Sequence, residues 1–149
     1  MRAVSQAEPI PSTPRRRPLR AWLAAVGVLG LMVGAALVWA APREDVAVPG
    51  RDATPEQVVI AYINAVNARD FDTANAIDAR PGSDLGRFSR SMEIHEVQMK
   101  KTLADGAATH VLFTADFDGG DGTIDDGIWG YYLERGSDGR WHITDAGVA

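Results

Sequence analysis

The side chains best suited to general acid–base chemistry in this sequence are His95, Tyr62 and Asp145. An imidazole changes its charge near neutral pH, and a phenol or carboxyl group placed beside it can pass on a proton. His95 alternates in phase with Val97 and Met99, so we expect these three side chains to point toward the core. His95, Tyr62 and Asp145 then form the one acid–base set that the sequence offers.

Three titratable residues of the predicted strands, one of them from this set, also fit structural roles. Asp145 alternates in phase with Trp141 and Ile143, so it also fits a cap at the end of the last strand. His110 and His142 alternate out of phase with the neighbouring aromatic residues, which places them on the outer face of a sheet. The sequence therefore allows two interpretations of its acid–base residues, a proton-transfer site and a purely structural set.

An acidic, glycine-rich stretch between two predicted strands contains the candidate metal ligands Asp116, Asp118 and Asp121. Carboxylate oxygens are the ligands that calcium prefers. A twelve-residue calcium loop beginning at Asp116 would have Gly120 where a ligand is needed and Gly127 where a glutamate is needed. We therefore predict a solvated hairpin loop and no bound metal ion.

The chain contains no motif for a serine or cysteine nucleophile, a phosphate-binding loop or a dinucleotide-binding fold. It also has no cysteine, which excludes disulfide bonds, zinc–thiolate sites and lipid attachment at a lipoprotein cysteine. We therefore predict no cofactor and favour a non-enzymatic domain over an enzyme.

The net charge of −5 is unevenly distributed along the chain. Residues 1–20 carry five arginines and one glutamate, whereas residues 43–149 carry ten basic and nineteen acidic side chains. Nucleic acid and anionic lipid would both repel the acidic part. We therefore predict that neither is the partner of the folded domain.

Residues 21–41 form an apolar run without a charged side chain. As a helix this run would be about 31 Å long, close to the thickness of a hydrocarbon core of about 30 Å. Trp22 and Trp39 stand near its ends, where indole rings prefer the membrane interface. Arginines cluster before the run, and Arg43 after it is offset by acidic neighbours. The pattern predicts a single-pass membrane protein with a cytoplasmic N-terminus.

A cleaved signal peptide is the alternative interpretation of the same run. Small residues at Val38 and Ala40 fit a cleavage site after Ala40, although both the basic region and the apolar run are long for a signal peptide. In either case the C-terminal part leaves the cytoplasm. If the helix is retained, Gly30 and Gly34 have the spacing that lets two membrane helices approach and form a homodimer.

The rest of the chain divides into three segments. Residues 1–20 are rich in proline and arginine, so we predict a disordered basic tail in the cytoplasm. Residues 42–53 contain two prolines and a glycine and are predicted to be a short tether. Residues 54–149 are sufficient for one folded extracytoplasmic domain and too few for two.

Two short helices are predicted at the start of this domain. Thr54, Pro55 and Gln57 form a capping box with a proline in the first turn, and the helical apolar period continues to about residue 68. A second helix is predicted from Asp70 to about Ile77.

From residue 90 onward the apolar period changes from 3.6 to two. This pattern predicts four strands joined by hairpins, at residues 92–103, 110–118, 127–135 and around 141–143. One face of such a sheet must be covered, and only the two helices can cover it. The predicted fold class is α+β, with an N-terminal transmembrane helix and two amphipathic helices packed on a curved four-stranded antiparallel sheet.

The residues 54–74, with the sequence TPEQVVIAYINAVNARDFDTA, resemble the opening helices of the NTF2-like (cystatin-like α+β) superfamily. Residues 129–133 and 139–143 resemble its final hairpin, and the layout is similar to that of membrane-anchored, actinobacterial-type exported proteins of unassigned function. The resemblance implies a cone between the sheet and the helices. This sequence departs from the family pattern because residues 84–88 form at most a turn in place of a third helix, and only four strands are evident.

The family includes isomerases and dehydratases that work in such a cone, as well as many binding and scaffold domains. We therefore expect a non-enzymatic extracytoplasmic binding or scaffold domain, tethered to the membrane, whose partner is an envelope protein or a small apolar ligand. The alternative is a small-molecule isomerase or dehydratase that uses His95 and Tyr62. A dimerisation module is the third possibility.

Overall fold

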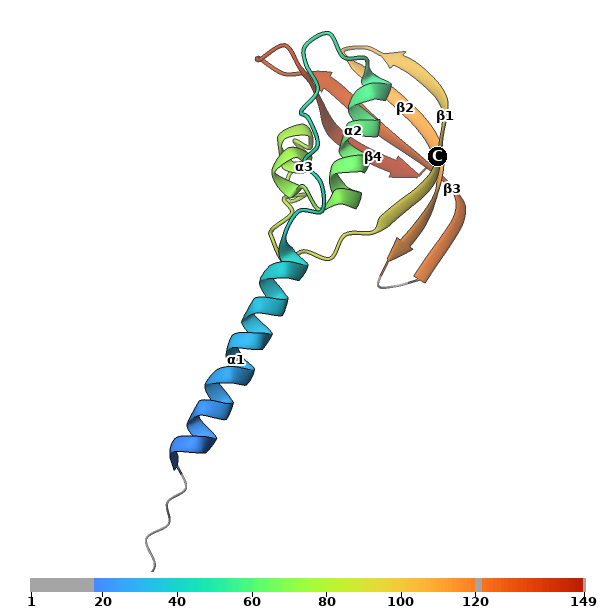
Figure 1. Cartoon of the computed structure of the whole chain (residues 1–149). Helices are drawn as coiled ribbons and strands as arrows, with labels where there is room; N and C mark the ends of the chain where they lie inside the picture. Colours follow the sequence, from blue (N-terminus) through green and yellow to red (C-terminus); the bar gives the residue numbers. More distant parts are fainter. Residues whose placement is uncertain (1–17, 120–121, 149) are drawn as a thin grey trace, which may run out of the picture. The chain divides into compact units, whose positions relative to one another are not determined.

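Figure 1 shows the computed structural model of the chain, which describes residues 18–119 and 122–148. Residues 1–17 of the predicted basic tail lie outside the described residues. The chain forms two compact units, Met1–Trp39 and Ala40–Ala149. The predicted domain limits at residues 20, 41 and 53 stay predictions.

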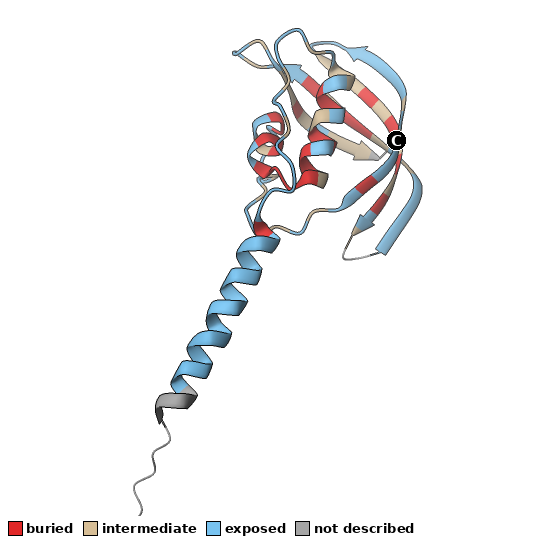
Figure 2. Cartoon of the chain, in the orientation of Figure 1, coloured by how far each residue is buried: buried red, intermediate tan, exposed pale blue. Residues whose placement is uncertain are grey.

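Helix α1, Pro18–Ala40, is the apolar element of the first unit. Its stretch Trp22–Ala40 is long and apolar enough to cross a membrane, a property that a membrane anchor shares with an export signal. Its described side chains before Ala40 are exposed (Figure 2), as expected for a surface that faces lipid. Gly30 and Gly34 lie on this exposed surface, and their role in pairing stays a prediction.

The two predicted helices of the folded unit are confirmed. Helix α2, Pro55–Ala68, begins with the expected capping box, in which Gln57 N donates to Thr54 Oγ1 (3.4 Å) and Thr54 N donates to Gln57 Oε1 (2.9 Å). Helix α3, Phe71–Ile77, begins where Asp70 Oδ1 accepts a hydrogen bond from Thr73 N (3.2 Å). Both helices present apolar side chains to the sheet.

The second half of the chain forms one antiparallel sheet in the order β1-β2-β3-β4. Its strands are β1 (Glu93–Asp105), β2 (Ala108–Gly119), β3 (Gly122–Arg135) and β4 (Trp141–Val148). The strands continue further into the turns than the sequence predicted, because the tight hairpins extend the pairing almost to the turn residues. The predicted α+β class is confirmed. The sheet is open, with β1 and β4 at its edges, and the cone implied by the family resemblance is not confirmed.

Helices α2 and α3 cover one face of the sheet, and the core lies between the two layers (Figures 1 and 2). The largest side chains that are fully enclosed there are Phe113, Ile77, Leu133, Ile143, Val58, Val59 and Val111. Burial of each such side chain contributes about 1.5–3 kcal/mol. Tyr131 is buried in the same core and Trp129 and Trp141 pack against it, so these aromatic residues are core residues.

The predicted tether is attached to the helical layer over part of its length. Arg43 N donates to Ala68 O (2.7 Å), at the end of α2. Val46 N donates to Asp70 Oδ2 (2.9 Å), and Val46 O accepts from Thr73 Oγ1 (2.9 Å). Asp70 therefore caps α3 with one carboxylate oxygen and holds the tether with the other.

Replacing Asp70 with alanine should release this segment. Asp70→Ala removes two backbone partners, so we expect a loss of about 1–2 kcal/mol in unfolding free energy. We also expect trypsin to cleave after Arg43 faster than in wild type, as measured by mass spectrometry of the fragments. Asp72→Ala, which changes an exposed aspartate in the first turn of α3, is the matched control and should cleave at the wild-type rate. Equal cleavage rates in the two variants would contradict the assigned attachment.

Candidate functional site

A cavity of about 330 Å³ lies between α2, the loop before β1 and the helix-covered face of the sheet. This volume is within the range of small-molecule sites. Its apolar wall consists of Val66, Leu85, Met92, Ile94, Phe117 and Trp129. Its polar groups come from Tyr62, Arg80, Arg90, Ser91 and Tyr131.

A wider depression of about 620 Å³ lies along the tether and α2. Its lining mixes Arg43 with Glu44 and Asp45, and the remaining residues are small or amide side chains. Charges of both signs at an open surface favour no particular ligand. The smaller cavity, with its apolar wall and convergent polar groups, is the better candidate site.

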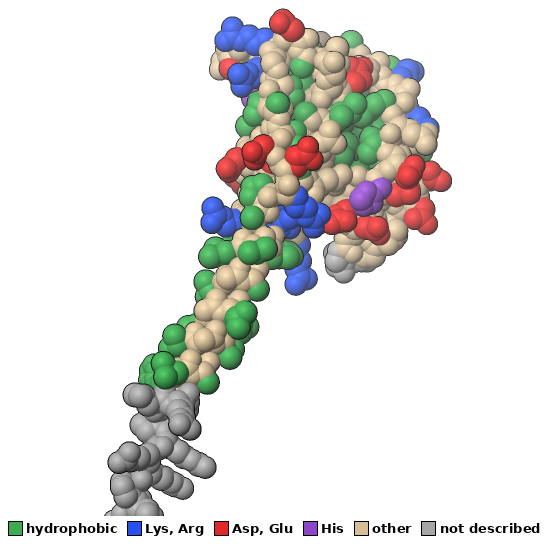
Figure 3. Space-filling view, in the orientation of Figure 1, with side chains coloured by type: hydrophobic (Ala, Val, Ile, Leu, Met, Phe, Trp, Pro, Cys, Tyr) green, Lys and Arg blue, Asp and Glu red, His purple; other side chains and the backbone are tan. Residues whose placement is uncertain are grey.

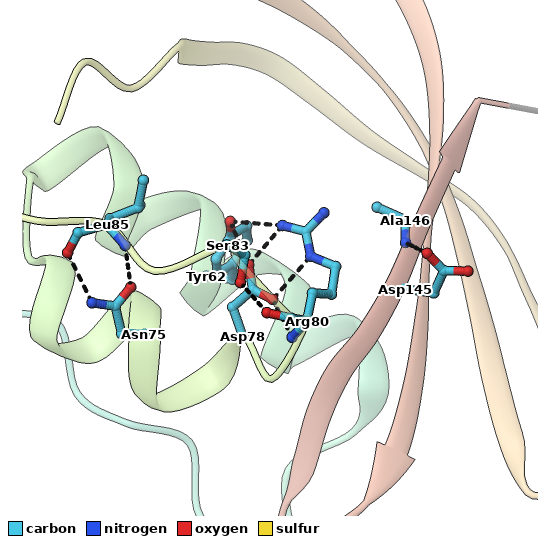
Figure 4. Close-up of polar contacts among 8 residues, drawn as sticks. All are labelled: Tyr62, Asn75, Asp78, Arg80, Ser83, Leu85, Asp145 and Ala146. Atoms are coloured by element: carbon cyan, nitrogen blue, oxygen red, sulfur yellow. Dashed lines mark hydrogen bonds and ion pairs between the residues drawn. The ribbon is translucent and has the colours of Figure 1, made fainter.

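Tyr62, Asp78 and Arg80 form a hydrogen-bonded network at this cavity (Figure 4). The Tyr62 hydroxyl donates to Asp78 Oδ2 (3.1 Å) and accepts from Arg80 Nη2 (3.2 Å). Arg80 binds the carboxylate through two contacts, Nε to Oδ1 (2.9 Å) and Nη2 to Oδ2 (2.6 Å). The Asp78 side chain is only 2% exposed, so this bidentate pair replaces the water that the carboxylate has lost.

The network keeps its protons in place near neutral pH. Burial alone would raise the pKa of Asp78, but the hydrogen bonds and the charge of Arg80 outweigh burial and lower this pKa below its ordinary value. The hydrogen bond to Asp78 raises the pKa of Arg80. Burial, with the neighbouring Tyr131 and Asp78, raises the pKa of Tyr62, so its hydroxyl stays protonated.

Two donor groups at the cavity are left over from this network. Within the described residues the protein offers no hydrogen-bond partner to the Tyr131 hydroxyl or to Arg80 Nη1. The Arg80 guanidinium lies over the Tyr131 ring, with Cζ 5.4 Å from the ring centroid. Burial raises the pKa of Tyr131 to about 12, so the hydroxyl remains a donor. Both groups can donate a hydrogen bond to a negatively charged oxygen of a ligand.

The local sequence explains why these side chains meet. Tyr62 lies on the buried face of α2. Asp78 ends α3, where its N–H donates to Ala74 O, and it forms an isolated bridge with Ile143 of β4. Residues 80–83 then turn away from the helix, with Ser83 N and Oγ both donating to Arg80 O. The end of α3 thus brings Asp78 and Arg80 between α2 and the sheet.

The structure does not bring His95, Tyr62 and Asp145 together. His95 is 51% exposed and its Nε2 lies 3.7 Å from Glu93 Oε2. It does not share the inward face with Val97, because a bulge at Glu96, where φ is 50°, shifts the alternation of β1 by one residue.

The other two members of the predicted acid–base set are also separated. Asp145 is exposed on β4, its Oδ1 accepts a hydrogen bond from Ala146 N (2.8 Å), and its side chain points away from Arg80 in Figure 4. The Tyr62 hydroxyl is occupied by Asp78 and Arg80. On the opposite face of the sheet, the His110 ring stacks on Tyr132 with centroids 4.0 Å apart.

The acidic loop uses its carboxylates within the hairpin. Asp116 Oδ1 accepts from Asp126 N (2.8 Å), and Asp118 Oδ1 accepts from Thr123 Oγ1 (2.6 Å). Asp121, the third candidate ligand, lies outside the described residues. In the part of the chain that the structure describes, no three histidine or carboxylate side chains are placed to hold a metal ion.

Sequence reasoning missed Asp78, Arg80 and the hydroxyl of Tyr131. Both charged residues follow the predicted end of the second helix near Ile77, where the sequence predicted no functional residue. The signal in the sequence is a pair of opposite charges, Asp78 and Arg80, that comes directly after a helix with a buried apolar face. Tyr62 was selected from the sequence, but as a proton donor or acceptor rather than as a partner of Asp78.

No family model matches the chain, and no curated protein matches it. Among solved structures it is similar to the solution structure of a SEC-C motif containing protein from Rhodopseudomonas palustris, with 17% sequence identity and a TM-score of 0.49. The match covers 64% of this chain and 79% of that protein. The predicted membership of the NTF2-like superfamily is therefore wrong: no family model supports it, and the similar structure is a SEC-C motif protein.

The buried ion pair predicts how stability depends on pH. The folded chain keeps Asp78 ionised to a lower pH than the unfolded chain does, where its pKa is near 3.8. The unfolded state therefore takes up the proton first as the pH falls. The stabilisation by this carboxylate is complete above the unfolded pKa and is lost as the pH falls through the lower, folded value.

Asp78→Asn removes this pH-dependent contribution. Chemical unfolding at a series of pH values should show wild type to be about 3 kcal/mol more stable than Asp78→Asn near neutral pH. The difference should shrink below about pH 4. Asp84→Asn, in the following loop, is the control and should follow wild type throughout. A wild-type advantage that stays constant down to acid pH would contradict the assigned ion pair.

Proposed function

We propose that this chain is a single-pass membrane protein whose folded domain, outside the cytoplasm, binds a small amphipathic anion in the cavity. The proposal is carried by two donor groups beside an apolar wall, Arg80 Nη1 and the Tyr131 hydroxyl, to which residues 18–119 and 122–148 offer no hydrogen-bond partner. The binding role continues the expectation drawn from the sequence, and the ligand class follows from the charge and shape of the cavity.

The membrane part of the proposal rests on α1 and the residues around it. The stretch Trp22–Ala40 is long enough to cross a bilayer, and its two tryptophans stand near the interfaces. The arginines before it favour a cytoplasmic N-terminus. We prefer a retained anchor to a cleaved signal because the basic and apolar segments are both long for a signal peptide.

The charge at the cavity favours an anion. The charged side chains that line it are Arg80 and Arg90, whereas the carboxylate of Asp78 lies behind Arg80 and already accepts from it and from Tyr62. A carboxylate or phosphate group of the ligand would accept from Arg80 Nη1 and the Tyr131 hydroxyl. Arg90 adds positive charge in a domain that is otherwise acidic.

The apolar wall accounts for the rest of the ligand. The Phe117 and Trp129 rings lie 4.9 Å apart between centroids, and Met92 supplies a flexible side chain beside them. These groups would cover a short hydrocarbon or aromatic portion. A ligand with an anionic head and an apolar body satisfies both parts of the cavity at once.

Binding is favoured over the isomerase or dehydratase alternative by the state of the protons. Proton transfer needs a group that can take up or release a proton near neutral pH. Tyr62 and Asp78 hold each other with pKa values shifted away from neutrality, and His95 lies elsewhere. The cavity is arranged to hold charge rather than to move a proton.

Benzoate and benzylamine are a matched pair of probes for this proposal, because they share an aromatic ring and carry opposite charges. In full-length protein reconstituted in lipid nanodiscs, benzoate should shift the NMR signals of cavity residues, whereas benzylamine should not. Tyr131→Phe removes a hydroxyl that has no partner in the described part of the chain, so it should weaken benzoate binding by about three- to tenfold with little change in stability.

Tyr132→Phe is the control for the tyrosine variant. Tyr132 is the neighbour of Tyr131 in β3 and stacks on His110 on the opposite face, so its hydroxyl should not affect binding. Equal responses to the two probes, or equal effects of the two tyrosine variants, would rule out an anion site at this position.

A further inference from the structure

A tight turn before β1 carries an exposed aromatic residue next to an arginine. Ser89 N donates to Gly86 O (2.8 Å), and Gly86 N donates to Ser89 Oγ (2.8 Å), so Arg87 and Phe88 occupy the tip. The Phe88 side chain is 60% exposed although nothing in the turn requires an apolar residue. A single exposed apolar side chain is ordinary on a protein surface, so the meaning of Phe88 depends on what lies around the turn.

The side chain of Arg69, at the end of α2, binds the backbone of the turn. The Arg69 Nη2 donates to Arg87 O (3.2 Å) and to Ser89 O (3.4 Å), and its guanidinium lies 5.0 Å from the centroid of the Phe71 ring. Arg69 ends α2 with φ of 58°, a conformation that normally favours glycine. The side chain of Arg69 thus links the end of α2 to the turn.

The turn lies beside the first residues of the folded unit. Arg87 lines a small cavity of about 110 Å³ together with Ala40, Pro42 and Arg69. Ala40, only 3% exposed, is also the last residue of the apolar stretch Trp22–Ala40. Because Arg87 and Ala40 line the same cavity, the turn is close to the residue at which a chain that crosses a bilayer with this stretch would leave the hydrocarbon.

Basic side chains gather near the turn in a domain that is acidic as a whole. Arg43, Arg87 and Arg90 are exposed around it, and Figure 3 shows basic side chains gathered where the folded unit begins. Two acidic residues line the same small cavity: Asp70 is occupied by the amides of Val46 and Thr73, whereas Asp72 is exposed. Arg43 is paired with Glu93 (3.2 Å), so Arg87 and Arg90 are the basic groups of this edge that remain to meet a lipid phosphate.

We infer that the Gly86–Ser89 turn docks on the bilayer that α1 spans, with Phe88 in the interface and Arg87 and Arg90 on lipid phosphates. An aromatic ring gains from burial at the headgroup boundary, and arginine forms charge-assisted hydrogen bonds with phosphate. The rigid turn loses little conformational entropy when it binds. This inference rests on the proposed membrane anchor, and it shares Arg90 with the proposed anion site in the cavity.

The depth of single spin labels tests the docking in the full chain, which has no native cysteine to interfere. Phe88→Cys places a label at the turn, Leu29→Cys places one at the middle of α1, and Ser137→Cys places one in the turn between β3 and β4. In nanodiscs that contain phosphatidylglycerol, electron paramagnetic resonance measures collisions with oxygen, which enriches in lipid, against a water-soluble nickel chelate. The oxygen-to-nickel collision ratio should be highest at position 29 and several-fold higher at 88 than at 137.

The three labels separate the failure of docking from the failure of the anchor. A lipid-exposed label at 29 with equal ratios at 88 and 137 would overturn the docking while the anchor stands, and would leave the turn free for a protein partner. A water-exposed label at 29 would overturn both the anchor and the docking that depends on it.

Arginine variants test the phosphate contacts. In the Phe88→Cys background, Arg87→Gln with Arg90→Gln should lower the oxygen-to-nickel ratio at the turn several-fold. Arg140→Gln, which removes an exposed arginine from the turn between β3 and β4, is the matched control and should leave the ratio unchanged. A ratio at position 88 that is insensitive to Arg87 and Arg90 would contradict their assigned role.

Discussion

The fold depends on the solution to one electrostatic problem, the burial of the Asp78 carboxylate. A charge removed from water is costly unless a partner of opposite charge and further hydrogen bonds replace its hydration. Arg80 supplies the charge, and the Tyr62 hydroxyl supplies a further donor from α2. Because Asp78 also pairs with Ile143 of β4, this network fastens the end of the helical layer to the sheet.

The same network determines what the cavity can do. Arg80 donates hydrogen bonds from Nε and Nη2 to Asp78 and Tyr62. In this position the guanidinium lies over the ring of Tyr131, and Nη1 remains available at the cavity. The protons of the network are held firmly, so the remaining capacity is to donate hydrogen bonds to an anion. A second basic residue with a local structural role, Arg69, fixes the turn before β1, and the loop that follows supplies Arg90 and Met92 to the cavity wall.

The helices and strands could be predicted from the sequence, but the way they pack together could not. The capping box at Thr54, the two helices and the four strands follow from local rules of spacing and were predicted. The inward orientation expected for His95 was wrong because one extra residue at Glu96 reverses the alternation, and no local rule reveals such a bulge. The pair of Tyr62 and Asp78 depends on how α2 and α3 pack, which spacing along the chain does not encode. The family assignment failed because a helical layer on an antiparallel meander occurs in unrelated proteins.

A double-mutant cycle between Asp78→Asn and Arg80→Gln tests the central electrostatic claim most directly. Unfolding free energies of wild type, the two single variants and the double variant give the coupling between the side chains. If the buried carboxylate depends on Arg80, the coupling should be about 2 kcal/mol or more, since each single variant leaves one partner unpaired. A coupling below about 0.5 kcal/mol, the level of independent sites, would show that Asp78 does not need Arg80 and would contradict the account.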